Sequence, residues 1–270
     1  MYKNIMSIFL STSVTLNYFE KYKNFLNSVN KNSPFNNSCI CVDFLPSQEE
    51  QEKYKNISFI YCDSKDVISK KNDKWPANRK TYLTLQGGEF LNYIDCKDED
   101  TIIFADYDTT MQRIPTKEEI DQFTNIEENV YCMQLEGFMS LLQHTLDALI
   151  TTTKNKNEVM AMFPNAENYK PHNAGFLYSS KQNLSKSFDL YKEMFTKFLP
   201  SLRSHAATQT IINYCFQHYG SVKQCPLSMT NAHWYATYGK QCKVNKGNKL
   251  SINNEEILFV HDKFIINLSY

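Results

Sequence analysis

Short apolar runs alternate with helical periodicity along the first hundred residues. Buried strands are expected at residues 6–10, 39–44, 57–62 and 102–105. Apolar positions with helical spacing fall after the first run, up to Pro34, and again after Asn78, a favourable N-cap residue. This β-α-β-β-α-β order predicts an α/β fold with a mostly parallel sheet and helices on both faces.

The second half of the chain is less regular. A strand is expected at residues 130–135, and residues 172–178 are typical of a turn that enters another strand. Amphipathic helices are expected over residues 184–198 and 211–219, and an apolar strand at 257–260 runs into His261. Neither a repeat nor a Gly/Pro/Ser-rich linker interrupts the chain, which predicts a single domain over residues 1–270.

Composition narrows the classes of function. The 29 basic and 29 acidic residues cancel, and no basic stripe with interleaved aromatics occurs, so a nucleic-acid partner is not expected. The eight cysteines form no C-x-x-C pair, which favours reduced thiols and a cytoplasmic location. No run approaches the roughly 18 apolar residues of a membrane span, so no integral membrane segment is expected, and the apolar residues 5–10 fit a first strand better than a signal peptide.

The most informative stretch is TIIFADYDTT, at residues 101–110. An apolar strand ends in Asp106 and Asp108, and the alternation of strand side chains points residues i and i+2 the same way. Two adjacent carboxylates repel each other unless a cation or ligand lies between them, which predicts a divalent-metal site at the carboxyl edge of the sheet. The plain alternative is a solvated acidic loop, because about three acid-x-acid pairs are expected by chance in such a chain.

Four short segments, taken in order, carry a resemblance to a known family: Asp106-Tyr107-Asp108, Asn173-Ala174-Gly175, Gln209 with Asn213, and His261. They resemble the DxD motif, the N-A-G turn, the Q-x-x-x-N helix and the late metal-binding histidine of nucleotide-sugar-dependent glycosyltransferases. Those enzymes have the GT-A fold, and the similarity is loosest to the glycogenin and lipopolysaccharide galactosyltransferase group. Thr208 replaces the acid that precedes the helix glutamine in that group, and the usual C-terminal motif is reduced to His261-Asp262-Lys263, which leaves retention or inversion of the anomeric centre open.

The resemblance implies an architecture and an activity. It implies a Rossmann-like, mostly parallel central sheet with a smaller mixed acceptor-side region. Residues 1–110 would bind the nucleotide sugar and residues 111–270 the acceptor. The implied activity is hexosyl or pentosyl transfer from a nucleoside diphosphate donor, most often a UDP-sugar in this fold, to a glycan or other hydroxyl acceptor.

The resemblance also implies roles for individual residues. Asp106, Asp108 and His261 would hold Mn²⁺ or Mg²⁺, and mixed carboxylate and imidazole ligation suits Mn²⁺. Catalytic roles are expected for Asp106, Asp108 and Gln209. Donor contacts are expected from Ser11, Thr12, Arg79, Lys80, Asp106 and Lys263, and substrate contacts from His172, Asn173, Ala174 and Gly175. Each of these residues could also have an ordinary structural role, as a solvated surface lysine or a structural histidine does.

Two other functions stay open at this point. Residues 106–110 also fit D-x-D-x-T, the first motif of haloacid-dehalogenase-type phosphatases, in which Asp106 would be the nucleophile and Asp108 a general acid. That motif normally opens the chain and needs a later acidic pair, which His261-Asp262-Lys263 does not supply. The third possibility is a non-catalytic nucleotide-sugar-binding module.

Overall fold

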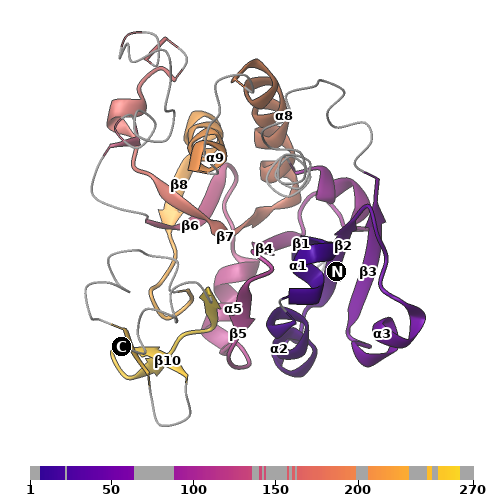
Figure 1. Ribbon diagram of the computed structural model, residues 1–270. Helices are drawn as coiled ribbons and strands as arrows, with labels where there is room; N and C mark the ends of the chain where they lie inside the picture. The colour runs from indigo at the N-terminus through magenta and orange to yellow at the C-terminus, as the bar shows by residue number, and fades with distance from the viewer. Residues whose placement is uncertain are drawn as a thin grey trace, which may run out of the picture.

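A twisted central sheet with helices packed on both of its faces dominates the molecule (Figure 1). The computed structural model describes residues 7–21, 23–63, 88–135, 140–141, 143, 157, 160–161, 163–198, 206–230, 242–244 and 249–261. Within this part of the chain, no helix is both long and apolar enough to cross a lipid bilayer.

The central sheet has seven strands in the order β3-β2-β1-β4-β7-β6-β8. They are β1 (Ile8–Thr15), β2 (Asn36–Val42), β3 (Ile57–Cys62), β4 (Thr101–Ala105), β6 (Val130–Leu135), β7 (His172–Ser180) and β8 (Ser221–Gln224). The pairs among β1, β2, β3 and β4 are parallel, as is the pair β6–β8, whereas β7 runs antiparallel to both of its neighbours. The predicted α/β class and mostly parallel sheet are therefore confirmed.

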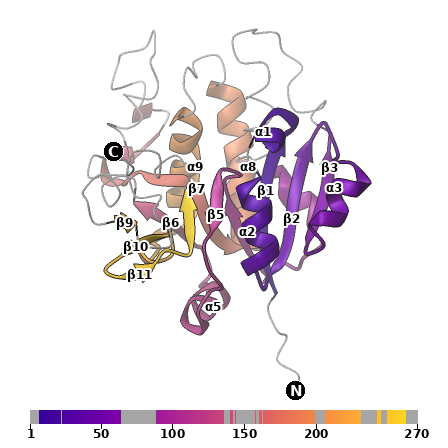
Figure 2. The same ribbon diagram turned by 60° about the horizontal axis from the view of Figure 1, so that its bottom comes forward.

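Different helices cover the two faces of the sheet (Figure 2). They pack on two separate clusters of apolar side chains. On one face, Ile102 and Phe104 belong to a cluster covered by η1 (Glu89–Tyr93), α8 (Lys181–Phe198) and α9 (Ala206–Tyr219). On the other face, Ile103 belongs to a cluster covered by α1 (Leu16–Lys21), α2 (Asn24–Asn32) and α5 (Lys117–Thr124). The continuously apolar strand β4 thus lies between two cores, as expected for a central strand of a parallel sheet. Two short elements complete the helices: α3 (Gln48–Lys53) and η2 (Ala166–Asn168).

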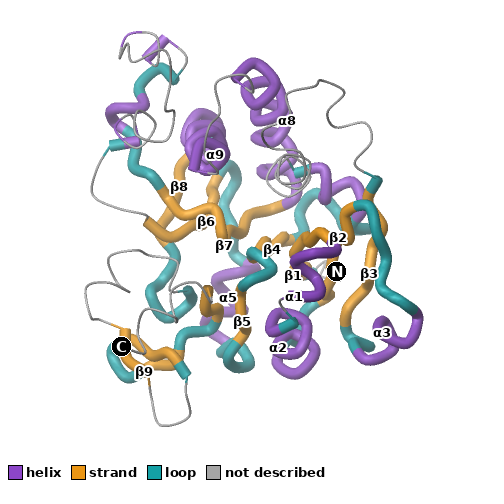
Figure 3. The backbone as a smooth tube through the Cα atoms, viewed as in Figure 1, coloured by secondary structure: helices purple, strands orange, loops and turns teal. Residues whose placement is uncertain are grey.

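Two small sheets accompany the central sheet (Figure 3). In one, β5 (Thr109–Met111) pairs antiparallel with β12 (Phe259–His261). The other consists of β9 (Cys242–Val244), β10 (Leu250–Ile252) and β11 (Glu255–Glu256). The side chain of Gln112 joins them: its amide nitrogen donates to the carbonyls of Leu250 and Ile257, and its oxygen accepts from the Leu250 N–H at 2.7 Å.

Several local expectations need correction. Strand β1 continues to Thr15, so it is longer than the expected strand at residues 6–10, and Ser11 and Thr12 lie inside it. The expected first helix is broken into α1 and α2, and α3 was missed because it has no buried face. Residues 173–175 are part of β7 and form no turn. The expected helix after Asn78 lies outside the described residues except at its end, where residues 89–93 form a 3₁₀ helix.

Candidate active site

Asp106 and Asp108 are brought together by a tight turn at the end of β4. The strand ends at Ala105, and the N–H of Thr109 donates to the carbonyl of Asp106 at 3.0 Å, which closes a four-residue turn. The two carboxylates therefore converge because of this turn, whereas the sequence pattern attributed their convergence to strand alternation. The turn lies at the carboxyl edge of the parallel strands, where open α/β sheets bind their ligands.

Tyr107, the residue between the two acids, anchors this turn in the core. Its ring stacks on Phe19 with 6.2 Å between centroids and lies 6.0 Å from Phe25. Burial raises the pKa of the Tyr107 hydroxyl far above its usual range, so the side chain stays neutral. Because Tyr107 occupies the core side of the turn, the flanking carboxylates are held on its open side.

His261 reaches the carboxylates through the pairing of β5 with β12. His261 lies opposite Thr109 in this ladder, one residue from Asp108. Its Nε2 atom is 3.4 Å from Oδ2 of Asp106 and 3.5 Å from Oδ1 of Asp108. The ring is buried, while the side chain of Asp106 is 32% exposed and that of Asp108 is 11% exposed. The cluster is thus reachable from one side and enclosed on the other.

The donor set fits a divalent cation. One ligand atom from each of Asp106, Asp108 and His261 lies within 4.8 Å of the others. Two carboxylates and a buried imidazole offer hard and borderline ligands, the combination that suits Mn²⁺. Three protein ligands also leave coordination positions for other oxygens.

An irregular stretch of β7 presses against this cluster. Between Met133 and Gln134 the register of β6 with β7 jumps, so that Ala174, Gly175 and Phe176 have no partner in β6. The carbonyl of Gly175 instead accepts a hydrogen bond from the Asp106 N–H at 2.8 Å. A Cβ atom on Gly175 would lie 2.9 Å from Oδ2 of Asp106 and 3.0 Å from Cδ2 of His261. Bulges of this kind commonly aim groups at active sites, and here the bulge requires a residue without a side chain.

Helix α9 holds the bulge from behind. The carboxamide oxygen of Gln209 accepts from the Ala174 N–H at 3.2 Å. The buried side chain of Asn213 accepts from the His172 N–H and donates to the His172 carbonyl, both at 2.7 Å. Gln209 and Asn213 are one helical turn apart, so the same face of α9 forms hydrogen bonds with both ends of the stretch 172–174.

His172 lies in this supporting layer. Its ring is 6% exposed, and Nδ1 lies 3.0 Å from the carbonyl of Lys170. Burial lowers the pKa of His172 to about 4, which keeps the ring neutral near pH 7. Its position favours a positioning role over the direct substrate contact that the resemblance implied.

The serine and threonine residues of β1 divide between the two faces of the sheet. Ser11 pairs with Phe104 at the end of the β1–β4 ladder, and the same register extended by two residues would bring Ser13 level with Asp106. Ser11 accepts a hydrogen bond from Ser38 at 3.1 Å, whereas the buried hydroxyls of Thr12 and Ser13 have no hydrogen-bond partner within the described structure. Alternation turns Thr12 to the face of Leu10 and Val14, under α1 and α2. Of the three residues Ser11, Thr12 and Ser13 at the end of the first strand, which the resemblance places in the base pocket, Ser13 is therefore better placed for a ligand at the acidic turn.

Three further expected site residues, Arg79, Lys80 and Lys263, lie outside the described residues.

Comparison with known proteins gives matches in structure. No family model matches the chain, and no curated protein matches its sequence. The galactosyltransferase LgtC, solved with donor and acceptor sugar analogues, matches with a TM-score of 0.57 at 13% identity, over 94% of this chain and 86% of that one. Mouse xyloside xylosyltransferase 1 matches with a TM-score of 0.55 at 13% identity, over 95% and 97% of the two chains.

The bifunctional glycosyltransferase WbbM matches over a shorter part of its length. The TM-score is 0.55 at 12% identity, and the match covers 85% of this chain. The chain spans 40% of WbbM, so it corresponds to one portion of that larger protein. At these identities the likeness concerns the fold, and the chain has the GT-A fold of these glycosyltransferases.

Proposed function

We propose that the protein is a metal-dependent glycosyltransferase that moves a hexose or pentose from a nucleoside diphosphate donor, UDP in the first instance, to a hydroxyl of a glycan. The observation that carries the proposal is the convergence of Asp106, Asp108 and His261 at the carboxyl edge of a GT-A sheet. The LgtC structure with donor and acceptor sugar analogues supports the choice of ligand class.

Asp106, Asp108 and His261 would hold the metal, with Mn²⁺ as the expected ion and Mg²⁺ as a substitute. A divalent cation in this place supplies Lewis-acid stabilisation of the negative charge that develops on the departing diphosphate. Asp106 is the more exposed carboxylate, which supports a second role for it as acceptor of a hydrogen bond from the donor ribose. Ser13, whose buried hydroxyl has no hydrogen-bond partner within the described structure, would offer that hydroxyl to the donor from β1.

The bulge of β7 would form the surface on which the transferred sugar rests. Gly175 leaves room beside Asp106, and Asn173 orders the bulge because its Oδ1 accepts from the Gly175 N–H at 2.8 Å. Gln209 supports the same segment because its side-chain oxygen accepts a hydrogen bond from the Ala174 N–H. Ordered supports of this kind fix reacting groups without reorganisation during the reaction.

The test is release of sugar from a donor panel. Purified protein is incubated with UDP- and GDP-linked hexoses and pentoses, with Mn²⁺ or with chelator, and free nucleoside diphosphate is measured. We expect one donor to be hydrolysed slowly without acceptor, only with metal, and Asp108→Asn to lower that rate at least a hundredfold. Asp98→Asn, which changes an exposed acid in the loop before β4, is the matched control and should retain the rate.

The same preparation separates the alternatives. A phosphatase would show burst phosphorylation of Asp106 with an aryl phosphate, whereas we expect no burst. Nucleotide binding without release from any donor would indicate a binding module. Equal release by wild type and Asp108→Asn would contradict the proposed site.

A further inference from the structure

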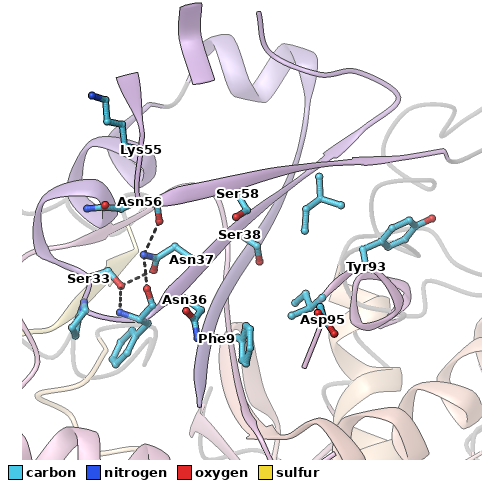
Figure 4. A pocket seen from close by; sticks show the side chains of 14 residues that line it. Phe9, Ser33, Asn36, Asn37, Ser38, Lys55, Asn56, Ser58, Tyr93 and Asp95 are labelled. Carbon is cyan, nitrogen blue, oxygen red and sulfur yellow. Dashed lines mark hydrogen bonds between the residues drawn. The ribbon is translucent and has the colours of Figure 1, made fainter. Parts of the chain in front are cut away.

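A hollow of about 640 Å³ opens near the amino ends of β2 and β3 (Figure 4). This is the edge of the sheet opposite to the acidic turn. Ser38, Ser58 and Phe9 form its floor on the sheet. Tyr93 and Asp95 stand on one side, and the turn at Ser33 with Asn56 stands on the other (Figure 4). The proposed activity makes no use of this site.

The hollow exists because small polar residues replace apolar ones on one face of the sheet. Ser38 and Ser58 face each other across β2 and β3, and two residues further along the same face the pair is Ile40 and Ile60. Ile40 is fully buried in the core beneath η1 and α8, whereas the serine pair leaves that volume open. The apolar core therefore ends at the isoleucine pair, and the hydroxyls of the serine pair line the space beyond it.

One rim of the hollow is rigid. The buried side chain of Asn37 donates to the carbonyls of Phe35 and Asn56 at 2.9 and 3.0 Å, and its oxygen accepts from the Ser33 hydroxyl at 2.6 Å. These bonds tie the turn before β2 to the residue before β3. A rim held in this way lowers the entropy that a ligand must remove on binding.

Three other polar side chains of the hollow are available to a ligand. The side chains of Asn36, Ser58 and Asp95 are exposed and make no hydrogen bond to any described residue. They provide an amide, a hydroxyl and a carboxylate, which together accept and donate hydrogen bonds. Tyr93, with 37% of its surface exposed, and Phe9 add aromatic faces.

The charge of the lining points to a neutral ligand. Lys55 and Asp95 are the charged residues among those that line the hollow, and they cancel. Among the described residues that line the hollow, no cluster of cations is present to hold a phosphate, in contrast to what a nucleotide requires. Aromatic faces combined with uncharged donors, acceptors and one carboxylate match a sugar ring, which has apolar C–H faces and a rim of hydroxyls. We propose that this hollow binds a neutral hexose unit of a glycan.

The hollow is separate from the acidic turn. Phe9 pairs with Ile102, which lies four residues before Asp106 on β4. At about 3.3 Å per residue, this is about 13 Å along the strand. The site would therefore hold a saccharide at one edge of the sheet while the carboxyl edge remains accessible.

The test maps saccharide binding on the full chain by ¹H–¹⁵N NMR in the presence of chelator. The probes are glucose, galactose, N-acetylglucosamine and lactose at up to tens of millimolar, with glucuronate and UDP as anionic comparisons. We expect a neutral saccharide to shift the amides of residues 36, 58 and 95 in a saturable manner. Asp95→Ala should weaken this binding about tenfold, the loss expected for one hydrogen bond to a charged group. Ser58→Phe should abolish it by filling the floor.

Two controls keep the result decisive. Asp98→Ala removes an exposed acid near the hollow but outside its lining and should bind as wild type. Asp108→Asn should also bind as wild type, so failure of the proposed transferase site would leave this result unchanged. The proposal is overturned if no neutral saccharide shifts these amides, if Asp95→Ala and Ser58→Phe, both folded by circular dichroism, bind unchanged, or if only the anionic probes bind.

Discussion

At the scale of single residues, Gly175 shows how closely the β7 bulge fits the acidic turn. Its missing side chain is what permits Asp106, Asn173 and His261 to meet around one point. A Cβ atom would lie 2.9 Å from carboxylate and amide oxygens, a separation that forces a neighbour to move. The glycine therefore acts through the geometry of the cluster and touches the core little.

We expect Gly175→Ala to weaken Mn²⁺ binding roughly tenfold, since a displaced ligand or outer-shell group typically costs ten- to a hundredfold in metal affinity. The free energy of unfolding of the same variant should change little, by roughly 1 kcal/mol, because the two oxygens in closest contact belong to the partly exposed side chains of Asp106 and Asn173. Calorimetric titration with Mn²⁺ and urea denaturation measure the two effects. Unchanged metal affinity would show that the bulge does not shape the cluster.

His172 makes folding stability depend on pH. Burial lowers its pKa from 6.5 to about 4 in the folded state, so the unfolded chain binds a proton first as the pH falls. The stabilisation is complete above pH 6.5 and is lost between pH 6.5 and 4. From pH 7.5 to pH 5 the free energy of unfolding should fall by about 2 kcal/mol from this group.

This pH dependence is checked by urea denaturation of two variants, each at pH 7.5 and at pH 5. They are His172→Gln and His218→Gln, the second being a control at an exposed site. The His172 variant should lose that part of the pH dependence, and the His218 variant should keep it. The same change in the free energy of unfolding with pH in both variants would mean that His172 is not buried in its neutral form.

At the scale of elements, the late strand β12 brings a histidine to the two acids that follow the early strand β4. Gln112 fastens the β10–β11 hairpin beside β5 with three hydrogen bonds, and Arg113 adds a bond from Nε to the Glu256 carbonyl at 2.7 Å. Arg113 is itself held by Glu119 in a two-pronged ion pair with both contacts at 2.7 Å. These contacts fix the segment that leads into His261.

Gln112→Ala should therefore act on both stability and metal binding. It removes the side-chain partner of the Leu250 N–H and of the Ile257 carbonyl, which costs about 2–3 kcal/mol, while the Leu250 carbonyl still accepts from the Ile257 N–H. Mn²⁺ affinity should fall in parallel because β12 loosens. Gln122→Ala, on the exposed side of α5, is the matched control and should change neither quantity. A destabilised variant with full Mn²⁺ affinity would show that the hydrogen bonds of Gln112 do not determine the position of His261.

The same elements explain what sequence patterns could predict. Strand β3, helices α8 and α9 and the acidic pair were visible because their signals are local: apolar runs, helical spacing and two carboxylates at a strand end. The pairing of Thr109 with His261 joins residues 152 positions apart and has no local signal, so it was not predicted, and only the resemblance connected His261 with the acidic pair. The bulge at Gly175 was read as a turn because Asn and Gly favour turns, and tertiary contacts with α9 decided otherwise.

At the scale of the whole molecule, the sheet separates two edges with different chemistry. The carboxyl edge holds two acids and a histidine, and the amino edge holds a neutral hollow lined by serines. Strand β7 runs antiparallel between β4 and β6, and this direction brings its first residues, 172–175, to the carboxyl edge. The central claim is that this edge binds a divalent cation.

Direct titration with Mn²⁺, followed by the loss of the free-ion signal in electron paramagnetic resonance, tests that claim most simply. The account predicts one site per chain in the wild type and in Asp98→Asn, and affinity lowered at least tenfold in Asp108→Asn. All three proteins should show the same circular dichroism. Mn²⁺ binding in Asp108→Asn as tight as in the wild type, or no binding in the wild type, would contradict the account.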